Sequence, residues 1–307
     1  MKAILLDHVG GPESLRYGDA PKPRPADKQL LVKVFATAVT PTEFAWHLTF
    51  HTREGGARSF PVILGHEFSG IVEAIGPAST GIRIGDSIYG FNDWFMDGAQ
   101  AEYCLTVPEH IAPKPERLKH TQAASVPISA LTAWQALIDR AHLSKGQRVL
   151  IHGGAGAVGS FAVQVARHRQ AHVVATASAE NADFVAGLGA DQVLDYRTTP
   201  FETVVMDMDV VLDTVGGTTR DRSWDVLKPG GRLVTIAADG ERFLQPRVRD
   251  AFFIVEPHRN QLLEISRLID AGVFKPVMDS VFSLDHFQEA YERKPLRGKH
   301  VLRVAEP

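Results

Sequence analysis

The stretch RVLIHGGAGAVGSFAVQVA, residues 148–166, contains an apolar strand, a glycine-rich turn and the start of a helix. Read from Gly154, the turn has the spacing G-x-G-x-x-G, which between a strand and a helix is typical of dinucleotide binding. We expect Gly154 to allow the tight turn, Gly156 to let the backbone approach a pyrophosphate, and Gly159 to let the helix pack closely on the strand.

The helix after this turn is expected to begin at about Ala157. The free backbone amides of Ala157 and Val158 would then face the diphosphate. Glycine-rich turns also occur with nothing bound. Here a second strand over residues 172–177 completes a βαβ unit, so the sequence favours dinucleotide binding.

Composition restricts the possible partners. The chain has 307 residues, of which 44% are hydrophobic and 22% charged, which suits a globular protein of two domains. The net charge of −3 gives no general attraction to nucleic acid or to anionic membranes. We therefore expect a small-molecule substrate, with no nucleic-acid and no membrane partner.

Cysteine usage and the N-terminus bear on the compartment. Cys104 is the single cysteine, so no internal disulfide can form. Residues 1–11 predict a first strand and not a signal peptide. No apolar run approaches the roughly 18 residues that a membrane helix needs. The expected location is the cytoplasm.

The sequence pattern changes along the chain. Residues 1–120 carry short β-like runs punctuated by Gly and Pro, which predict a compact β-rich domain. A long helical stretch interrupted by Pro127 then leads into the glycine-rich turn. Beyond it, strands and single helices alternate, which predicts a parallel sheet with right-handed crossovers. The expected strands are 148–152, 172–177, 192–196, 209–214 and 232–237.

The end of the chain returns to a mixed pattern. Helices are expected at 261–271 and 284–293, and a final strand at 300–304. These elements can complete either domain. We expect a catalytic domain of residues 1–120, completed by 260–307, and a nucleotide-binding domain of residues 121–259.

Further stretches resemble a known family in its order along the chain. They are LGHEFSGIVEAIG (64–76), GDSIYGF (85–91), PISALTAWQAL (127–137), LGADQVLDY (188–196), VVLDTVGG (210–217), LKPGGRLVTI (227–236) and RGKHVLRV (297–304). Together they are similar to the medium-chain dehydrogenase/reductase superfamily, in its zinc-free quinone oxidoreductase branch. The resemblance implies an α/β protein, in which a GroES-like β-barrel catalytic domain joins a Rossmann domain with a doubly wound parallel sheet. It also implies an active site in the cleft between the domains.

The resemblance bears on metal binding. Zinc-dependent members of the superfamily use thiolates and a histidine, and the place of the first catalytic cysteine is taken here by Thr40. His66 and Glu67 match the histidine-glutamate pair of those enzymes. They read either as remnant ligands or as a hydrogen-bonded turn, and we favour the turn. We expect no metal.

The resemblance also implies the cofactor NADP(H). The second strand of the Rossmann unit, residues 172–177, is followed by Ser178, where NAD-specific folds place a carboxylate. In the resembling branch, a serine here binds the 2′-phosphate and a tyrosine packs beside the adenine, which matches Ser178 and Tyr196. The usual nearby lysine is absent, so Arg197 or another cation would supply the charge. Glu180 complicates this interpretation, and a plain turn serine is the alternative for Ser178.

Without a metal or a convincing nucleophile, the fitting reaction is hydride transfer from the nicotinamide to a quinone or an α,β-unsaturated ketone. Thr40, Thr42 and Thr132 are candidate donors to the developing oxyanion or to the nicotinamide. Thr132 matches a family threonine near the cofactor. Its alternative role is a helix threonine that bonds its own backbone.

Further cofactor contacts are expected where the parallel strands end. Val215 and Ala237 follow two such strands, whose carboxyl ends form the ligand crevice. By resemblance, Phe253 runs past the nicotinamide and Lys299 lies near the cofactor. The aromatic segment 44–61 falls where the family forms its substrate-side loop, and it would offer the flat surfaces of Trp46, Phe50 and Phe60. The alternative is a surface loop whose aromatic side chains pack among themselves.

Other functions remain open at this point. The alternative from another class is an NADPH-binding sensor or structural protein with little turnover, because the glycine-rich turn reports binding alone. A zinc alcohol dehydrogenase is disfavoured by the single cysteine. A homodimer is possible by analogy with similar proteins.

Overall fold

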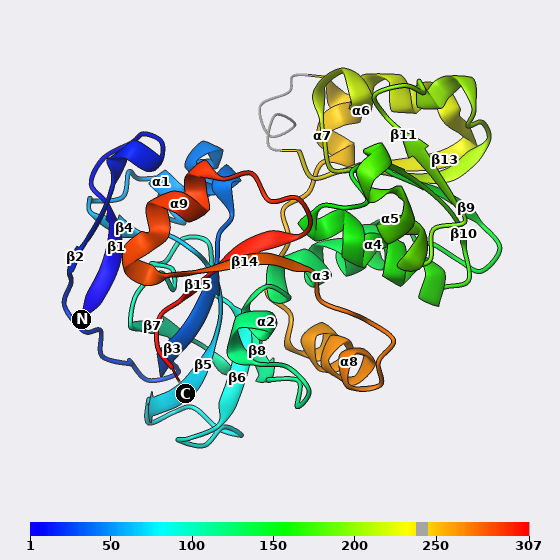
Figure 1. Cartoon of the computed structure of the whole chain (residues 1–307). Helices are drawn as coiled ribbons and strands as arrows, with labels where there is room; N and C mark the ends of the chain where they lie inside the picture. Colours follow the sequence, from blue (N-terminus) through cyan, green and yellow to red (C-terminus); the bar gives the residue numbers. More distant parts are fainter. Residues whose placement is uncertain (238–244, 307) are drawn as a thin grey trace.

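The computed structural model describes residues 1–237 and 245–306, and these form two lobes that lie side by side (Figure 1). One lobe combines the N-terminal strands with the end of the chain. The other lobe contains the glycine-rich turn. This arrangement confirms the expected pairing of a β-rich unit with a nucleotide-binding unit.

A large sheet forms the first lobe. Its strands follow the order β14-β15-β3-β5-β6-β8, and β7 also pairs with β3. Neighbours are antiparallel except β14 and β15, which are parallel. The strands are β3 (Leu30–Ala38), β5 (Glu67–Ile75), β6 (Ser87–Phe91), β7 (Tyr103–Thr106), β8 (Ile111–Pro113), β14 (Met278–Ser283) and β15 (Lys299–Arg303). A small sheet of β2 (Leu15–Asp19), β1 (Lys2–Leu6) and β4 (Val62–Ile63) lies beside it.

The second lobe is built on five parallel strands in the order β11-β10-β9-β12-β13. This confirms the doubly wound parallel sheet. The strands are β9 (Arg148–Ile151), β10 (His172–Ala177), β11 (Gln192–Asp195), β12 (Met208–Asp213) and β13 (Leu227–Thr235). Their connecting helices are α4 (Ala157–His168), α5 (Ala182–Gly187) and α6 (Gly217–Ser223). The central strands read as apolar runs because helices cover the sheet.

The helical stretch between the lobes joins them. Its parts are α2 (His120–Ala124) and α3 (Pro127–Trp134), which continues as a π-helix over Gln135–Arg140. Pro127 starts α3, a position where the missing amide proton costs nothing. α3 packs on α4 of the second lobe and on β6 of the first. One hydrophobic core therefore runs from Tyr89 and Phe91 to Val149 and Ile151.

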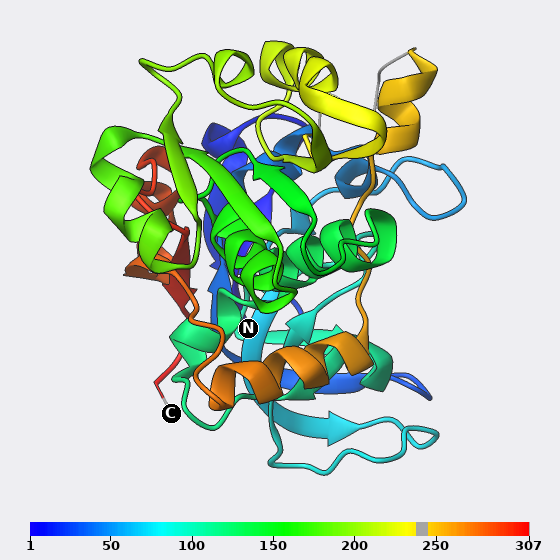
Figure 2. The ribbon, with the colours of Figure 1, turned by 90° about the vertical axis from the view of Figure 1, so that its right-hand side faces the viewer.

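The end of the chain returns to the first lobe. β15 pairs with β3, with Val301 opposite Ala38. Helix α8 (Arg259–Asp270) packs on β8 and α3, and Figure 2 shows it between the green helices and the cyan strands. The remaining helices are α1 (His47–Phe50), α7 (Pro246–Ala251) and α9 (Phe287–Glu292). The domain boundaries at residues 120 and 259 stay a prediction. Helix α2, most of which they assign to the nucleotide-binding domain, packs on β3 and β5 of the first lobe.

One local expectation was wrong. The sequence indicated a strand that begins only after Pro229-Gly230-Gly231, but β13 already begins at Leu227. Gly230 has a φ of 78°, and the pairing register shifts between Met208 and Val210, so the glycines form a bulge and not a break.

Among the described helices, none is long and apolar enough to cross a membrane.

Candidate active site

A cavity of about 390 Å³ lies where the two lobes meet. It is lined by the segment after β3, the start of α3, the start of α4, the residues that follow β12 and β13, and the segment around β15. Its walls are mainly apolar. The cavity brings together the following predicted site residues: Thr40, Thr132, Ala157, Val158, Val215, Ala237, Phe253 and Lys299.

The glycine-rich turn leaves an open backbone surface beside this cavity. A side-chain carbon on Gly159 would lie 2.1 Å from the Gly153 carbonyl oxygen, so glycine is required where α4 meets the turn. At Gly156, which is exposed, the nearest such contact is 3.3 Å away. In the described part of the chain no side chain caps the start of α4. Its first amides are therefore available to a phosphate.

Gly154 lies in the turn, but it is not the residue with the left-handed backbone. The residue with the left-handed backbone is Gly153, at a φ of 72°. A side-chain carbon on Gly154 would lie 3.0 Å from Val185 and 3.1 Å from Ala175, so this glycine allows close packing against β10 and α5. The turn conformation therefore begins one residue before the predicted motif.

Hydroxyl residues in the cavity wall include Thr40, Ser129 and Thr132. Thr132 donates to the Ile128 carbonyl oxygen at 2.6 Å, which matches its alternative role as a helix threonine. Its only proton is used there, while its oxygen can still accept. Thr40 Oγ1 and Ser129 Oγ are buried and have no hydrogen-bond partner among the described residues. A buried unpaired hydroxyl is costly. Both oxygens are closed to solvent as the side chains stand, so each reaches a bound molecule only after its side chain rotates toward the cavity.

Sequence reasoning missed Ser129. It lies three residues before Thr132 in α3, so both face the same side of the helix. This spacing was the available signal. Thr42 also lines the cavity and is exposed.

Lys299 lines the cavity and forms a buried ion pair with Glu67. The second Glu67 oxygen accepts from the Ile128 backbone amide at 2.9 Å. Burial raises the pKa of the Glu67 carboxyl, and Lys299 opposes that rise. Glu67 therefore contacts distant segments, instead of forming the local turn that we favoured.

The aromatic segment contributes one wall residue. Trp46 lines the cavity and packs edge-on against Trp94, with ring centres 4.7 Å apart. The Trp94 indole donates to the Val255 carbonyl oxygen at 2.9 Å, which fixes this wall. Phe50 and Phe60 do not line the cavity; they pack against a core cluster of the first lobe. For these two residues the alternative of packed aromatics holds.

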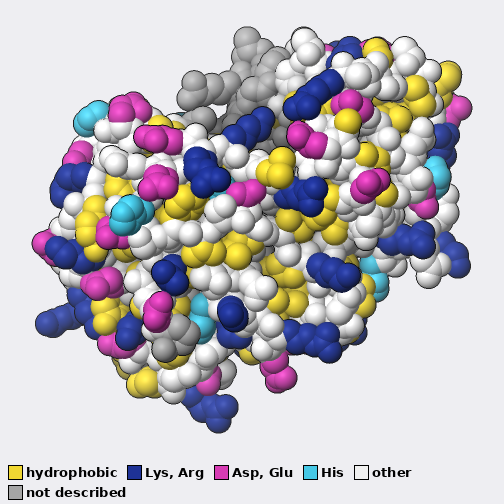
Figure 3. Space-filling view, viewed as in Figure 1, with side chains coloured by type: hydrophobic (Ala, Val, Ile, Leu, Met, Phe, Trp, Pro, Cys, Tyr) yellow, Lys and Arg dark blue, Asp and Glu magenta, His cyan; other side chains and the backbone are white. Residues whose placement is uncertain are grey.

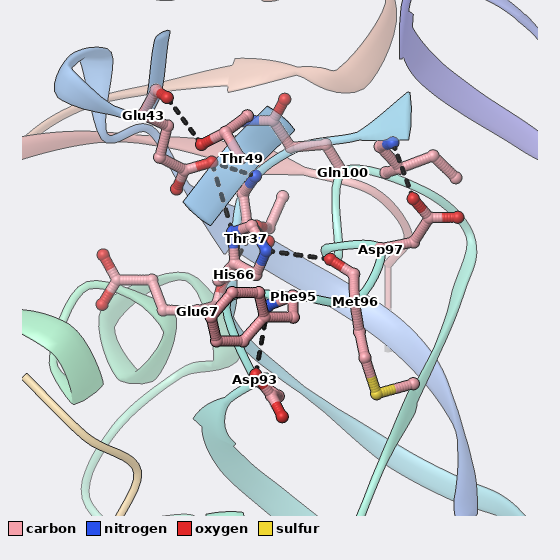
Figure 4. Close-up of polar contacts among 12 residues, drawn as sticks. Thr37, Glu43, Thr49, His66, Glu67, Asp93, Phe95, Met96, Asp97 and Gln100 are labelled. Carbon is pink, nitrogen blue, oxygen red and sulfur yellow. Dashed lines mark hydrogen bonds and ion pairs between the residues drawn. The ribbon is translucent and has the colours of Figure 1, made fainter. Parts of the chain in front are cut away.

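The residues around His66 do not fit a zinc site. His66 Nδ1 lies 3.3 Å from Glu43 Oε2, and Nε2 lies 3.1 Å from the Met96 carbonyl oxygen (Figure 4). A ligating histidine needs one ring nitrogen directed at the metal, and both are engaged here. Among the described residues, no group of three or more His, Cys, Asp or Glu side chains is placed to hold a metal.

Cys104 offers no substitute ligand. It lies in β7, opposite Val32 of β3, and is buried. Burial raises the pKa of its thiol to about 12, so it stays protonated and is a poor metal ligand.

Ser178, Tyr196 and Arg197 lie outside the cavity, at the ends of β10 and β11. The two strands are parallel neighbours, and the Tyr196 amide donates to the Ala177 carbonyl oxygen at 3.2 Å. Tyr196 is exposed, whereas Ser178 is buried. The structure therefore brings these three residues together at one edge of the sheet, as the adenosine end of a dinucleotide requires.

Family models match two parts of the chain. The model described as "Alcohol dehydrogenase GroES-like domain" matches residues 26–116, and "Zinc-binding dehydrogenase" matches residues 188–302. The second description mentions zinc binding, whereas the described residues around His66 do not fit a zinc site.

Three relatives align over nearly the whole chain. A "Probable zinc-binding oxidoreductase, mitochondrial" of Arthroderma benhamiae is 32% identical and covers 95% of this chain and 93% of its own. The "NAD(P)H oxidoreductase RTN4IP1, mitochondrial" of Danio rerio is 30% identical, with 100% and 92% covered. The "2-methylene-furan-3-one reductase" of Solanum lycopersicum is 31% identical, with 95% and 75% covered.

Solved structures give the same picture. The quinone oxidoreductase from Coxiella burnetii superposes with a TM-score of 0.88 at 30% identity, and 99% of each chain is covered. Mycobacterial Rv1454c in complex with NADPH superposes with a TM-score of 0.83 at 28% identity, with 99% and 100% covered.

Proposed function

The chain belongs to the medium-chain dehydrogenase/reductase superfamily, among its quinone oxidoreductase-like members, and from this we propose that it transfers a hydride from NADPH to a quinone or an α,β-unsaturated carbonyl compound without a metal. The protein is an oxidoreductase, and its cofactor is NADP(H). The acceptor and the independence from zinc are the parts that we propose.

The observation that carries the proposal is that the buried hydroxyls of Thr40 and Ser129 in the cavity wall have no partner among residues 1–237 and 245–306. When bound, the nicotinamide ring supplies the hydride. A conjugated acceptor takes it at carbon, the negative charge moves to the carbonyl oxygen, and solvent supplies the proton. Two neutral hydroxyls can stabilise such a delocalised charge, whereas a simple ketone would need a stronger acid or a Lewis acid.

Other residues of the chain bind and orient. The turn at Gly156 and the start of α4 receive the diphosphate, and Lys299 lies at the cavity wall, where Glu67 holds its ammonium group. The Thr132 oxygen can accept from an amide of the cofactor because its own proton is already used. Trp46 offers an apolar wall to a planar acceptor.

The test follows NADPH oxidation against quinones, enones and aldehydes, with and without a chelator. Turnover of quinones or enones that survives chelation supports the proposal. Tight NADPH binding without turnover of any acceptor would favour a sensor or structural protein. Alcohol oxidation that a chelator abolishes would favour a zinc enzyme.

Location and assembly are proposals as well. We propose a cytoplasmic protein that forms a homodimer; the names of two relatives place those proteins in mitochondria. On the face shown in Figure 3, acidic and basic side chains are interspersed, which agrees with a small-molecule partner in place of nucleic acid. Fluorescence microscopy of a tagged chain and analytical ultracentrifugation test these points.

A further inference from the structure

Two arginines from separate segments contact the turn that follows β10. Arg197 comes directly after β11, and its Nη2 atom lies 3.7 Å from Glu180 Oε1. Arg297 precedes β15, in the red segment that extends to the second lobe in Figure 1. Its Nε donates to Asn181 Oδ1 at 2.7 Å, and its Nη2 donates to the Glu180 carbonyl oxygen at 3.4 Å.

These contacts orient the Ser178 hydroxyl toward Glu180. Because Arg297 binds Asn181 Oδ1, the amide nitrogen of Asn181 faces Ser178 and donates to its Oγ at 3.1 Å. The Ser178 hydroxyl in turn donates to Glu180 Oε1 at 3.0 Å. Ser178 and Asn181 are each 5% exposed, whereas the Glu180 side chain is 56% exposed. A buried chain of hydrogen bonds thus ends on one exposed carboxylate.

The Glu180 carboxylate alone does not balance the positive charges of Arg197 and Arg297 at this turn. In the described part of the chain, no carboxylate lies within ion-pair distance of Arg297, whose guanidinium instead stacks on the Phe184 ring at 4.4 Å. Arg197 shares Glu180, and its backbone amide donates to Asp195 at 3.0 Å. Both guanidinium groups therefore contact the turn that also carries the Ser178 hydroxyl.

We propose that the Glu180 carboxylate occupies the place of the 2′-phosphate of NADPH, and that Arg297 and Arg197 receive this phosphate after the Glu180 side chain turns outward. This inference rests on the proposed function. The Ser178 hydroxyl has one proton, so it cannot donate to Glu180 and to a phosphate together. A phosphate monoester carries a charge of about −1.5 to −2 and three acceptor oxygens, which suit two guanidinium groups better than one carboxylate does.

Glu180 and Arg297 then set cofactor preference in opposite directions. Glu180 competes with the phosphate and lowers the affinity for NADPH. Arg297 raises it, both as a charge and by fixing Asn181. NADH has no 2′-phosphate, so its binding leaves the Glu180 contact in place.

The experiment compares NADPH with NADH, and adenosine 2′,5′-bisphosphate with adenosine 5′-monophosphate, by calorimetric titration. Glu180→Gln should tighten the two phosphate-bearing ligands by about fivefold and leave the other two unchanged. Arg297→Gln should weaken the phosphate-bearing ligands by about tenfold, and Arg297→Lys by less, because the forked donor is lost but the charge is kept. Glu289→Gln and Arg83→Gln remove the same charges at exposed positions and should change nothing.

The inference is overturned if Glu180→Gln weakens NADH, which would mean that the carboxylate binds the ribose hydroxyl. It is also overturned if Arg297→Gln weakens all four ligands equally. Quinone reduction at saturating NADH separates this question from the proposed function. If quinones are reduced with NADH and neither variant changes the affinity for the phosphate-bearing ligands, only the exchange at Glu180 is refuted. A wild-type protein without turnover refutes the proposed function, while the adenosine ligands still test the exchange.

Discussion

Lys299 and Glu67 form a buried ion pair at the cavity although 232 residues separate them in the sequence. Glu67 also accepts from the Ile128 backbone amide at 2.9 Å. The pair thus ties β15 to β5 and to the start of α3, the helix that joins the two lobes. A residue that the sequence associates with the cofactor is also part of the framework that shapes the cavity.

Replacing Lys299→Met should lower the free energy of unfolding by about 3 kcal/mol, because a buried carboxylate loses its cation. The loss should shrink at acidic pH. The pKa of the Glu67 carboxyl is raised in the folded state, so the folded protein binds this proton more tightly than the unfolded chain does. The contribution of Glu67 to the free energy of unfolding is therefore retained at low pH and lost as the pH rises. Urea unfolding at several pH values measures this. The double variant Glu67→Gln, Lys299→Met should recover most of the stability, and a double variant as unstable as the sum of the singles would contradict the pairing.

Replacing Ser178→Asp should weaken NADPH binding more than NADH binding, since a carboxylate repels the 2′-phosphate. The separation should reach at least about tenfold in Kd. Fluorescence titration with both cofactors measures it. Ser178→Ala serves as the control that removes the hydroxyl without adding charge. Equal weakening of both cofactors by Asp would count against a phosphate site at the end of β10.

Replacing Thr40→Val or Ser129→Ala should each reduce kcat by about tenfold and leave the Kd of NADPH unchanged, because each change removes one donor to the acceptor oxygen. Thr132→Val should instead weaken cofactor binding, since its proton is committed to Ile128. Steady-state kinetics with one quinone, combined with cofactor titration, separates the two effects. A larger loss of kcat in Thr132→Val than in Thr40→Val would reverse these roles.

His152 should make stability depend on pH. It is 1% exposed, between Thr176 and Ser223, and burial lowers its pKa to about 4. The unfolded chain binds this proton at about pH 6.5, so below that pH the free energy of unfolding falls, by about 2 kcal/mol at pH 5. His152→Asn should flatten this part of the profile. The pKa of His120 is also lowered to about 4, so His120 contributes equally to the pH profiles of the wild type and of the variant. Identical slopes in wild type and variant would refute the assignment.

The sequence allowed accurate prediction where spacing alone determines structure. The glycine-rich turn, the apolar runs that became β9, β10 and β12, and the alternation of helices and strands led to the parallel sheet. Gly159 was also interpreted correctly, since a helix that touches a turn leaves no room for a side chain.

Contacts between distant segments could not be predicted from spacing. Arg297 reaches Asn181 across 116 residues, and only the fold around Ser129 determines that its hydroxyl finds no partner in the part of the chain that the structure describes. The strand β14 has polar residues at half of its positions and carries no clear alternation. The choice of Gly153 over Gly154 for the turn depends on backbone angles, which the motif does not encode.

Transfer of deuterium from NADPH labelled at C4 to a conjugated enone tests the central claim most directly, with metal content measured on the same chelator-treated protein. We predict that deuterium appears on the β-carbon of the product and that Thr40→Val slows this transfer. The account would be contradicted if no label reached the product, or if transfer occurred only after zinc was added back.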